Sequence, residues 1–556
     1  MKTRFLSFTL AVMMIISLVC TTAVAEDKNL YGYDEPVTIK VGLSHGPTFK
    51  YVGEENAQNN NWTNLYRENN ILLDILYEVD SSQADTKMST AIISGNYPDI
   101  INATPSTFVN FAENGVIADI TDVFEEYASD YLKEYLAVDG GMSLQNCMVN
   151  GRLYGLPMMG NSYDTVPMMW IRADWLETLG LEVPKTIEEF KKVAHAFTYD
   201  DPDQNGLNDT YGLAINGVDV LTNAPGDISA IFAAFNAYPG TDGLAFVKGE
   251  DGKVTWGGTN AEGMKATLQV LQDMYADGSI SKTFITMNNN SINEEMGANR
   301  CGIWFGPMWS SMGASANAIK SDHKAHMIAA PVPSGLGQEV TKVFMAPSMS
   351  NVFCVSSKCA NPEVLIKLVN TSVQKFCYPT SDEEFTRYYG SAGKHTGNQA
   401  CLTITLAPLK NLDNYRKESA AVRTGDTTGL NAEQLGDYTY MKTFLDAYNS
   451  GTFDVEDPVF SAGVSYYTVF GDPQGAYALI DTMIAKDGYT LSAYNSVPTD
   501  SMAENAETLK KMTIETIVKI ITGEPVESYD KFLSTWYALG GEDIIADVQA
   551  WAEANK

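Results

Sequence analysis

The order of strand-like and helix-like segments near the start of the chain constrains its fold most. Residues 37–43 (VTIKVGL) alternate apolar and polar side chains, and 71–79 form a second strand-like run. A helix-like stretch covers 84–94, and a turn at 96–99 leads into a short apolar segment. Strand, helix and strand in this rhythm are typical of a parallel sheet with helical crossovers. We therefore expect an α/β fold.

The length of the chain predicts more than one core. It has 556 residues, whereas a single hydrophobic core rarely serves more than about 250–300 residues. Neither an internal repeat nor a low-complexity linker divides the sequence. Two lobes that share several chain crossings are therefore favoured over separate domains on a string.

The charge of the chain excludes one class of partner. There are 69 acidic and 37 basic residues, which gives a formal net charge of −32. Such a surface repels nucleic acids and anionic membranes, so we expect no nucleic-acid partner. The charge favours a soluble protein, and we expect a monomer, but it identifies no ligand.

The first 25 residues have the layout of an export signal. A cationic start is followed by an almost unbroken apolar run at 5–19 and by the small-residue cleavage site Ala23–Ala25. Lipid attachment at Cys20 and an uncleaved anchor are alternatives, although Val19 stands where lipoprotein processing needs a small residue. No later run approaches the roughly 20 apolar residues that span a bilayer. We expect an extracellular or periplasmic protein, free or tethered at its start.

Six cysteines would remain after removal of the signal. An exported protein can form disulfides, but the spacing does not select a pairing. Cys354 and Cys359 are close enough in sequence to bridge across a turn, and buried free thiols are the alternative. The six residues are Cys147, Cys301, Cys354, Cys359, Cys377 and Cys401.

Two segments match the capping box that begins many helices. Thr186 is followed three residues later by Glu189, and Thr259 by Glu262. In this motif the hydroxyl and the carboxylate each bind a backbone N–H of the first turn. Apolar residues recur at helical spacing after both sites, so we predict two helices with one buried face each.

The sharpest motif is Asp201–Asp209 (DPDQNGLND). Its oxygen-bearing residues match positions 1, 3, 5 and 9 of an EF-hand calcium loop, with glycine at position 6. The motif predicts a structural Ca²⁺ loop at 201–212, and a metal-free Asp/Asn/Gly turn is the alternative. Position 12 is Gly212 instead of glutamate, so another group must complete the shell. The candidate ligands are the side chains of Asp201, Asp203, Asn205 and Asp209 and the backbone carbonyl of Leu207.

Aromatic residues are the second signal, with eight tryptophans and 29 tyrosines. Sugars present flat C–H faces that stack on rings and hydroxyls that bond to carboxylates and guanidinium groups. Core packing is the alternative for any one tryptophan, and a structural ion pair is the alternative for Arg172. Our candidates for contact with a small ligand are Trp62, Tyr97, Asp99, Trp170, Arg172, Trp304 and Trp309.

Motifs for catalysis are weak. Neither HExxH nor GxSxG occurs, and residues 390–396 (GSAGKHT) lack the spacing of a phosphate-binding loop. A pair of glycosidase carboxylates is defined by geometry, not by spacing. We expect a protein without catalytic residues, with an exported polysaccharide-degrading enzyme as the alternative.

Several segments together resemble family 1 extracellular solute-binding proteins of ABC importers, in the branch that includes alginate- and oligosaccharide-binding members. They follow one another in the right order over nearly the whole mature chain. The segments are Gly95–Asp99, Gly155–Pro157, Trp170–Leu176, Leu179–Thr186, Asp201–Leu213, Gly302–Trp309, Gly523–Pro525 and Tyr529–Phe532.

The resemblance implies a periplasmic-binding-protein-like fold, in which two interleaved α/β lobes are joined by a multi-strand hinge, with helical C-terminal additions. The division we expect is a signal peptide at 1–25, lobe 1 at 26–158, lobe 2 at 159–291, a return to lobe 1 at 292–345, and lobe 2 with C-terminal helices at 346–556. The strand at Gly302–Gly306 would be the one that returns.

The resemblance also implies a function. Lobe closure would capture a small molecule, expected to be a carbohydrate and specifically an oligosaccharide, for delivery to the transmembrane subunits of an ABC permease. An EF-hand-like loop binds calcium in related proteins, which supports the loop at 201–212. A ligand-presenting partner of a membrane sensor would have the same fold.

Overall fold

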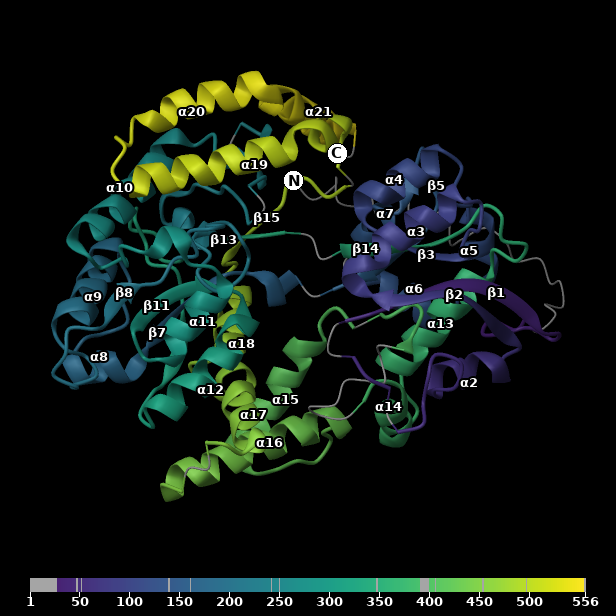
Figure 1. The fold of residues 1–556 in the computed structure, drawn as a ribbon, viewed down its shortest axis with the longest axis horizontal. Helices are drawn as coiled ribbons and strands as arrows, with labels where there is room; N and C mark the ends of the chain where they lie inside the picture. The colour runs from purple at the N-terminus through teal and green to yellow at the C-terminus, as the bar shows by residue number, and fades with distance from the viewer. Residues whose placement is uncertain are drawn as a thin grey trace, which may run out of the picture.

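Two separate hydrophobic cores organise the chain in the computed structural model (Figure 1). The core of lobe 1 draws its side chains from 39–159 and 352–401, and that of lobe 2 from 166–343 and 412–548. The signal segment and Cys20 lie outside the described residues. The structure describes 28–554 apart from 47–48, 52, 139–140, 161, 242, 250, 347–348, 391–399, 406, 453–454 and 497.

Lobe 1 is built on a five-stranded sheet with the order β2-β1-β3-β14-β6. β1 runs parallel to β2 and β3, whereas β14 is antiparallel to both β3 and β6. The three early strands and the helix between them confirm the predicted α/β pattern. The strands are β1 (Val37–His45), β2 (Ile71–Asp80), β3 (Ile100–Ala103), β6 (Leu156–Met159) and β14 (Met349–Val355).

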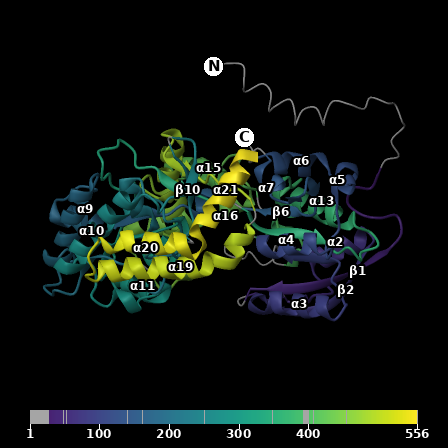
Figure 2. The same ribbon diagram turned by 90° about the horizontal axis from the view of Figure 1, so that it is seen from above.

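Helices cover the sheet of lobe 1, and β4 (Met148–Val149) and β5 (Arg152–Leu153) form a small hairpin beside it. Figure 2 shows this lobe beside lobe 2, with α3 next to β1 and β2. The helices are α2 (Asn61–Glu68), α3 (Ala84–Ile93), α4 (Pro105–Glu113), α5 (Thr121–Tyr127), α6 (Asp130–Ala137), α7 (Met142–Gln145), α13 (Val364–Cys377) and α14 (Asp382–Tyr388).

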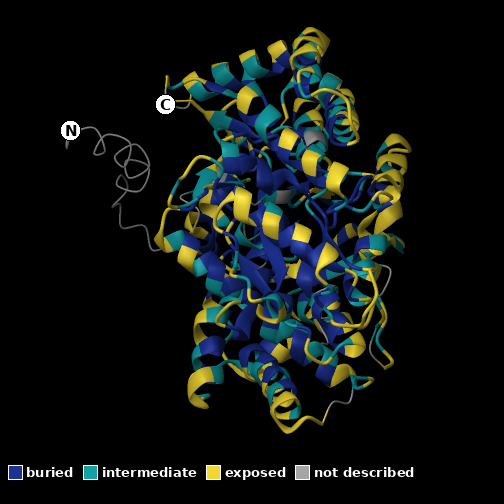
Figure 3. Cartoon of the chain, turned by 90° about the vertical axis from the view of Figure 1, so that its left-hand side faces the viewer, coloured by how far each residue is buried: buried dark blue, intermediate teal, exposed yellow. Residues whose placement is uncertain are grey.

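Lobe 2 has a four-stranded sheet with the order β12-β7-β11-β8. In Figure 3 its buried strands lie beneath helices whose outer turns are exposed. The strands are β7 (Met168–Arg172), β8 (Tyr211–Leu213), β11 (Cys301–Gly306) and β12 (Met327–Ala330), and the helices around them are α8 (Ala173–Leu179), α9 (Ile187–Tyr199), α10 (Ala261–Asp277), α11 (Asn289–Gly297) and α12 (Met312–Ser321). Two strand pairs complete the lobe, β9 (Phe246–Lys248) with β10 (Val254–Trp256) and β13 (Val343–Met345) with β15 (Tyr489–Leu491).

The C-terminal part of the chain is helical and packs on lobe 2. In Figure 1 the helices α15–α17 lie along the lower side of the molecule, and the last three lie along the upper side. They confirm the predicted helical C-terminal additions. These helices are α15 (Lys410–Thr424), α16 (Ala432–Ser450), α17 (Pro458–Tyr466), α18 (Ala476–Ala485), α19 (Asp500–Ile521), α20 (Ser528–Trp536) and α21 (Glu542–Ala554).

The predicted division between the lobes is wrong at the return segment. β11 pairs with β7 and β8, so residues 292–345 belong to lobe 2. The strand that returns is β14, which pairs with β3 and β6 and brings 349–405 into lobe 1. The strands β11 and β14 are both short and mostly apolar and buried, and such runs do not reveal their pairing partner. The core residues of the described chain therefore change lobe three times, between 159 and 166, between 343 and 352, and between 401 and 412.

One of the two predicted capping boxes forms in the structure. The capping box at α9 is confirmed, with Thr186 accepting from the N–H of Glu189 and Glu189 accepting from that of Thr186. The box expected at Thr259 is wrong, because Asn260 is the N-cap of α10 and accepts from the N–H of Gly263. An amide one residue later caps the helix instead of the hydroxyl.

The six cysteines all carry free thiols, and neither Cys354 nor Cys359 is bridged. This agrees with the alternative of unpaired thiols. Among the described helices, none combines the length and apolar character that a membrane span requires.

Gly212 provides a test of the packing between β8 and α9. A β-carbon at this position would lie 2.5 Å from the backbone oxygen of Ala194. We expect Gly212→Ala to lower the free energy of unfolding by about 1–3 kcal/mol, because the strand cannot approach the helix as closely. Urea-induced unfolding measures the change. The control is Gly313→Ala in α12, where a β-carbon meets no atom within 4 Å; an equal loss there would contradict this explanation.

Candidate functional site

The direction of the strands, from amino to carboxyl end, defines which edges of the two sheets face the chain crossings. In lobe 1, His45 ends β1 and Met159 ends β6, and Met159 pairs with Met349 at the start of β14. In lobe 2, Met168 at the start of β7 pairs with Gly306 at the end of β11. These ends lie next to the crossings, so the carboxyl ends of β1, β3, β6, β8 and β11 all point towards the boundary between the lobes. In open α/β sheets, ligands bind outside the carboxyl ends of the strands.

Lobe 1 presents a group of rings at this edge. His45 stacks on Phe49, with ring centroids 4.1 Å apart, and Tyr51 meets the edges of both rings. Glu78 near the end of β2 fixes the group, because Tyr51 donates to it at 2.9 Å and His45 Nε2 lies 3.1 Å from the same oxygen. His45 Nδ1 is buried and has no hydrogen-bond partner among the residues that the structure describes. Rings and a carboxylate with spare hydrogen-bonding capacity suit a polyhydroxylated ligand.

Lobe 2 presents Trp309 in the turn that follows β11. The side chain is 43% exposed, unlike the tryptophans of the sheet. Of the seven predicted ligand contacts, Trp309 alone combines a place at the crossing edge with an exposed ring. Its flat face is available for stacking on a sugar or another apolar surface.

Asp164 connects the first crossing to the third. It lies in a short 3-10 turn (Ser162–Thr165) directly after the first crossing and accepts hydrogen bonds from Tyr477 of α18 and from Asn411 of α15 at 2.8 Å. Burial raises the pKa of its carboxyl group. Because Asn411 follows the third crossing, this carboxylate joins two of the three chain segments that link the lobes.

Three of the predicted tryptophans are core residues instead of ligand platforms. Trp62, Trp170 and Trp304 are all fully buried. Trp62 donates to the carbonyl of Tyr388 inside lobe 1 at 3.1 Å. Trp170 and Trp304 stack on one another in the sheet of lobe 2, with centroids 6.2 Å apart. Their position beside turns in the sequence does not distinguish them from Trp309, and the expectation that they face the ligand is corrected.

Tyr97 and Asp99 were predicted to contact the ligand but lie at the opposite edge of the lobe 1 sheet. Tyr97 and Asp99 precede β3, so they lie at the end of the lobe 1 sheet away from the crossings. Asp99 accepts from the N–H of Lys40 at 2.7 Å, and the Lys358 ammonium lies 3.6 Å from the centre of the Tyr97 ring. Both are thus held by contacts within lobe 1.

Arg172 ends β7 on the side away from the crossings. It is fully buried, with bonds to Asp174 and an ion pair with Asp322. Its ring neighbour is Trp175, 4.5 Å away. The alternative of a structural ion pair is therefore the better description of this residue.

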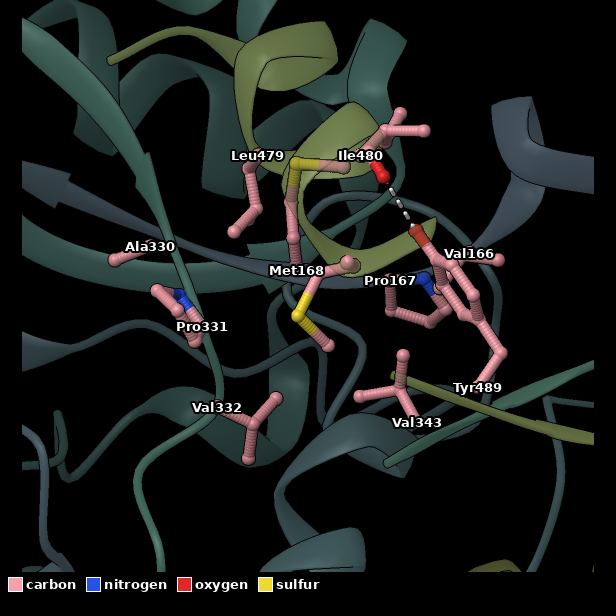
Figure 4. Close-up of a pocket in the computed structure, with 11 residues that line it drawn as sticks. Val166, Pro167, Met168, Ala330, Pro331, Val332, Val343, Leu479, Ile480 and Tyr489 are labelled. Atoms are coloured by element: carbon pink, nitrogen blue, oxygen red, sulfur yellow. Dashed lines mark hydrogen bonds between the residues drawn. The ribbon is translucent and has the colours of Figure 1, made fainter. Parts of the chain in front are cut away.

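A cavity near the crossings is too small to hold a sugar. It lies between the start of β7, the end of β12 and α18 and encloses about 20 Å³ (Figure 4). That space suits a single water molecule at most. Its walls are almost wholly apolar, formed by Val166, Pro167, Met168, Ala330, Pro331, Val332, Val343, Leu479, Ile480, Met483 and Tyr489. We interpret it as a packing void.

The predicted calcium loop folds as a tight turn after α9. Asn205 and Gly206 donate their N–H groups to Asp201, and the Asn205 amide donates to Asp203 at 2.8 Å and to Asp209 at 3.2 Å. Gly206 has a φ of +77°, a conformation that glycine adopts readily. The four side chains therefore converge on one region.

The electrostatics of this loop favour a cation. Burial raises the pKa of Asp203, and the carboxylates of Asp201 and Asp209 raise it further. None of the salt bridges among the described residues involves these three aspartates. Three carboxylates, an amide oxygen and a backbone carbonyl match the oxygen ligands that Ca²⁺ prefers.

The arrangement falls short of a formed metal site. Among the residues that the structure describes, no three acidic, histidine or cysteine side chains are grouped as for a metal ion. The Asn205 amide nitrogen lies between Asp203 and Asp209, where a cation would be. Position 12 cannot carry a side chain, because Gly212 lies inside β8 against α9.

No sequence motif had identified four of these residues, which are His45, Phe49, Tyr51 and Asp164. The signal available for the first three was their place directly after the first strand of an α/β sheet, where ligand-binding residues gather. No local signal marks Asp164, because its partners are about 250 and 310 residues away in sequence.

Comparisons with known proteins agree with this architecture. The model of the bacterial extracellular solute-binding protein family matches residues 47–375, more than half of the chain. The polygalacturonan/rhamnogalacturonan-binding protein YtcQ of Bacillus subtilis (strain 168) is 25% identical over 498 residues, which cover 88% of this chain and 86% of the relative.

Two solved structures have the same fold. An EF-hand mutant of the S. pneumoniae ABC-transporter substrate-binding protein FusA, in complex with fructo-nystose, has a TM-score of 0.61 at 19% identity over 94% of this chain and 100% of its own. The alginate-binding protein AlgQ2 without calcium ion has a TM-score of 0.59 at 15% identity over 95% and 100%. The predicted periplasmic-binding-protein-like fold is confirmed, and the chain belongs to the bacterial extracellular solute-binding protein family.

Proposed function

We propose that this protein captures an oligosaccharide between its lobes and delivers it unchanged to the permease of an ABC importer. The observation that carries the proposal is the orientation of the two sheets, whose carboxyl ends face the same three crossings. The relative YtcQ is named for binding polygalacturonan and rhamnogalacturonan, and FusA was solved in complex with fructo-nystose. Both names support a carbohydrate ligand.

The chemistry at the two edges suits a sugar. Trp309 offers an apolar face from lobe 2, and the His45–Phe49–Tyr51 group offers rings and hydrogen-bonding atoms from lobe 1. A ligand that touches both edges at once would favour the closed arrangement of the lobes, because the closed state gains contacts that the open state lacks. No covalent step is needed for this role.

The first 25 residues support a further part of the proposal. Their export-signal layout supports a location outside the cytoplasm, as does the description of the family as extracellular. We propose cleavage after Ala25, with lipid attachment at Cys20 as the alternative.

Replacement of Trp309 tests the ligand site. We expect Trp309→Ala to weaken the binding of the best oligosaccharide about tenfold, because a lost stacking contact is worth about 1–2 kcal/mol. Isothermal titration calorimetry on neutral and acidic oligosaccharides identifies the ligand and measures the change. Chromatography of the same mixtures shows whether any sugar is converted.

Two control variants accompany this test. Tyr131→Ala removes an equally exposed ring (43%) from α6, which contributes no residue to the proposed site, and should not alter binding. Trp304→Ala removes a buried ring and should lower the free energy of unfolding by about 3–5 kcal/mol. Conversion of a sugar, or undiminished binding by Trp309→Ala, would count against the proposal.

We also propose that the loop at 201–212 binds a structural Ca²⁺ ion. Asp201, Asp203, Asn205 and Asp209 would hold it with their side chains and Leu207 with its carbonyl. The positive charge of the ion would offset the negative charges of the three carboxylates. FusA was solved as an EF-hand mutant, and AlgQ2 was solved without calcium ion, which supports a metal at such a loop in relatives.

Removal of divalent cations tests this site. We expect a chelator to lower the melting temperature and added Ca²⁺ to restore it, because an ion that binds only the folded protein stabilises it. Asp203→Asn should abolish most of this response, whereas Asp251→Asn in an exposed turn should leave it intact. A chelator without effect, or an unchanged response in Asp203→Asn, would show that the loop is a metal-free turn.

A further inference from the structure

Three carboxyl groups and one lysine are buried together in the helical layer of lobe 2. Glu418 lies on α15, and Glu433 and Asp437 lie on α16, with exposures of 0%, 4% and 3%. Lys410, the first residue of α15, forms an ion pair with Glu433 at 2.6 Å. The ligand site proposed above uses none of these groups.

The hydrogen-bonding capacity of this group is unfilled. Both oxygens of Glu418, Oε2 of Glu433 and Oδ1 of Asp437 are buried without a hydrogen-bond partner among the described atoms. If all three carboxyls were ionised, Lys410 would balance only one charge. Buried charges without partners cost several kcal/mol each, so protons are the simplest means of balancing the group.

The surroundings favour the protonated forms. Burial raises the pKa of Glu418 well above its usual range, and the charges of Asp437 and Glu433 raise it further. Burial and Glu433 raise the pKa of Asp437 to about 8. Burial acts to lower the pKa of Lys410, but Glu433 outweighs it and Lys410 stays charged.

Few other ionisable groups face the cluster. Asp413 on α15 adds negative charge beside Glu418. Tyr466 on α17, Tyr440 on α16 and Tyr389 after α14 contribute phenol rings. Lys410 is the cation that acts on all three carboxyls, so proton binding decides the net charge of the group.

The cluster lies where the two lobes meet. The Tyr389 ring, part of the lobe 1 core, lies 5.3 Å from the Lys410 ammonium. Ala432 at the start of α16 packs against the same lobe 1 core, and α14 contacts α16. Any motion of the lobes that separates α14 from α16 would therefore let water reach the carboxyl groups.

We propose that Glu418 and Asp437, together with Lys410, Glu433 and Tyr389, form a proton-operated latch that holds the lobes in the arrangement of this structure. Protonated carboxyls tolerate burial beneath lobe 1. Loss of the protons leaves like charges on α15 and α16 that repel one another and draw in water, which releases the contact between α14 and α16.

The direction of the pH effect follows from proton linkage. The buried arrangement binds protons more tightly than one in which the carboxyls are hydrated, with ordinary pKa values near 4. The stabilisation of the buried arrangement is therefore fully present below about pH 4. It weakens as the pH rises from there to about 8, and it is lost above about pH 8. A consequence for ligand affinity rests on the proposed function, whereas the lobe arrangement itself does not.

Small-angle X-ray scattering of the ligand-free mature protein tests the latch. We expect the radius of gyration to change reversibly as the pH rises from about 4 to about 9.5, with the change complete above about pH 8. The double variant Glu418→Gln, Asp437→Asn should keep the low-pH value throughout, because neutral amides imitate the protonated carboxyls. Asp446→Asn, an exposed carboxylate on the same helix, should behave like the wild-type protein.

Two results would overturn the proposal: a radius of gyration that is constant over this range in the wild-type protein, or an unchanged transition in the double variant. Circular dichroism establishes that each variant is folded, and the single variant Asp437→Asn, expected to reduce or shift the transition, takes the place of the double variant if that one does not fold. Since no ligand is present, failure of the latch is distinguishable from failure of the proposed oligosaccharide binding.

Discussion

Parallel strand pairing is the constraint on which the rest of this molecule depends. Once β1, β2 and β3 run side by side in the same direction, their carboxyl ends must share one edge of the sheet. The antiparallel return of β14 then starts at that edge, and β6 ends there. The first two crossings lie at this edge because β6 ends there and β14 starts there, and the chain enters lobe 2 at the matching edge of the second sheet. The hinge and the proposed ligand site therefore adjoin one another as a result of strand direction.

The same constraint explains which parts of the structure could be predicted from the sequence. Alternating polarity identified β1, and the Thr186–Glu189 box identified the start of α9, because each signal lies within a few residues. The strands at 301–306 and 349–355 are both apolar and fully or largely buried, so their sequences do not tell which lobe each joins. The pairing of β11 with β7 is decided by contacts about 130 residues apart, and no local pattern records it.

The predictions of ligand-contacting tryptophans were also limited by what a local pattern can show. Trp62, Trp170 and Trp304 stand beside turns like Trp309, yet only Trp309 keeps an exposed ring. Trp170 and Trp304 lie on strands that are buried on both faces, and Trp62 lies on the buried side of α2. All three pack in the core, where a large apolar side chain gains most. Trp309 stays exposed because it lies in the turn beyond β11. Burial, which depends on the whole sheet, thus separates a ligand platform from a core residue.

The helical C-terminal additions connect the chain segments of the hinge to one another through side-chain hydrogen bonds. A minimal hinge of three chain crossings would bend with little resistance, but here Asp164 after the first crossing is bonded to Asn411 after the third and to Tyr477 of α18. One residue before Asn411, Lys410 touches Tyr389 of lobe 1 and pairs with the buried Glu433. The start of α15 is therefore held on one side by the hinge carboxylate and on the other by the buried carboxyl cluster. In the proposed latch, both contacts act on the same helical turn, which would couple the charge state of the buried groups in lobe 2 to the angle between the lobes.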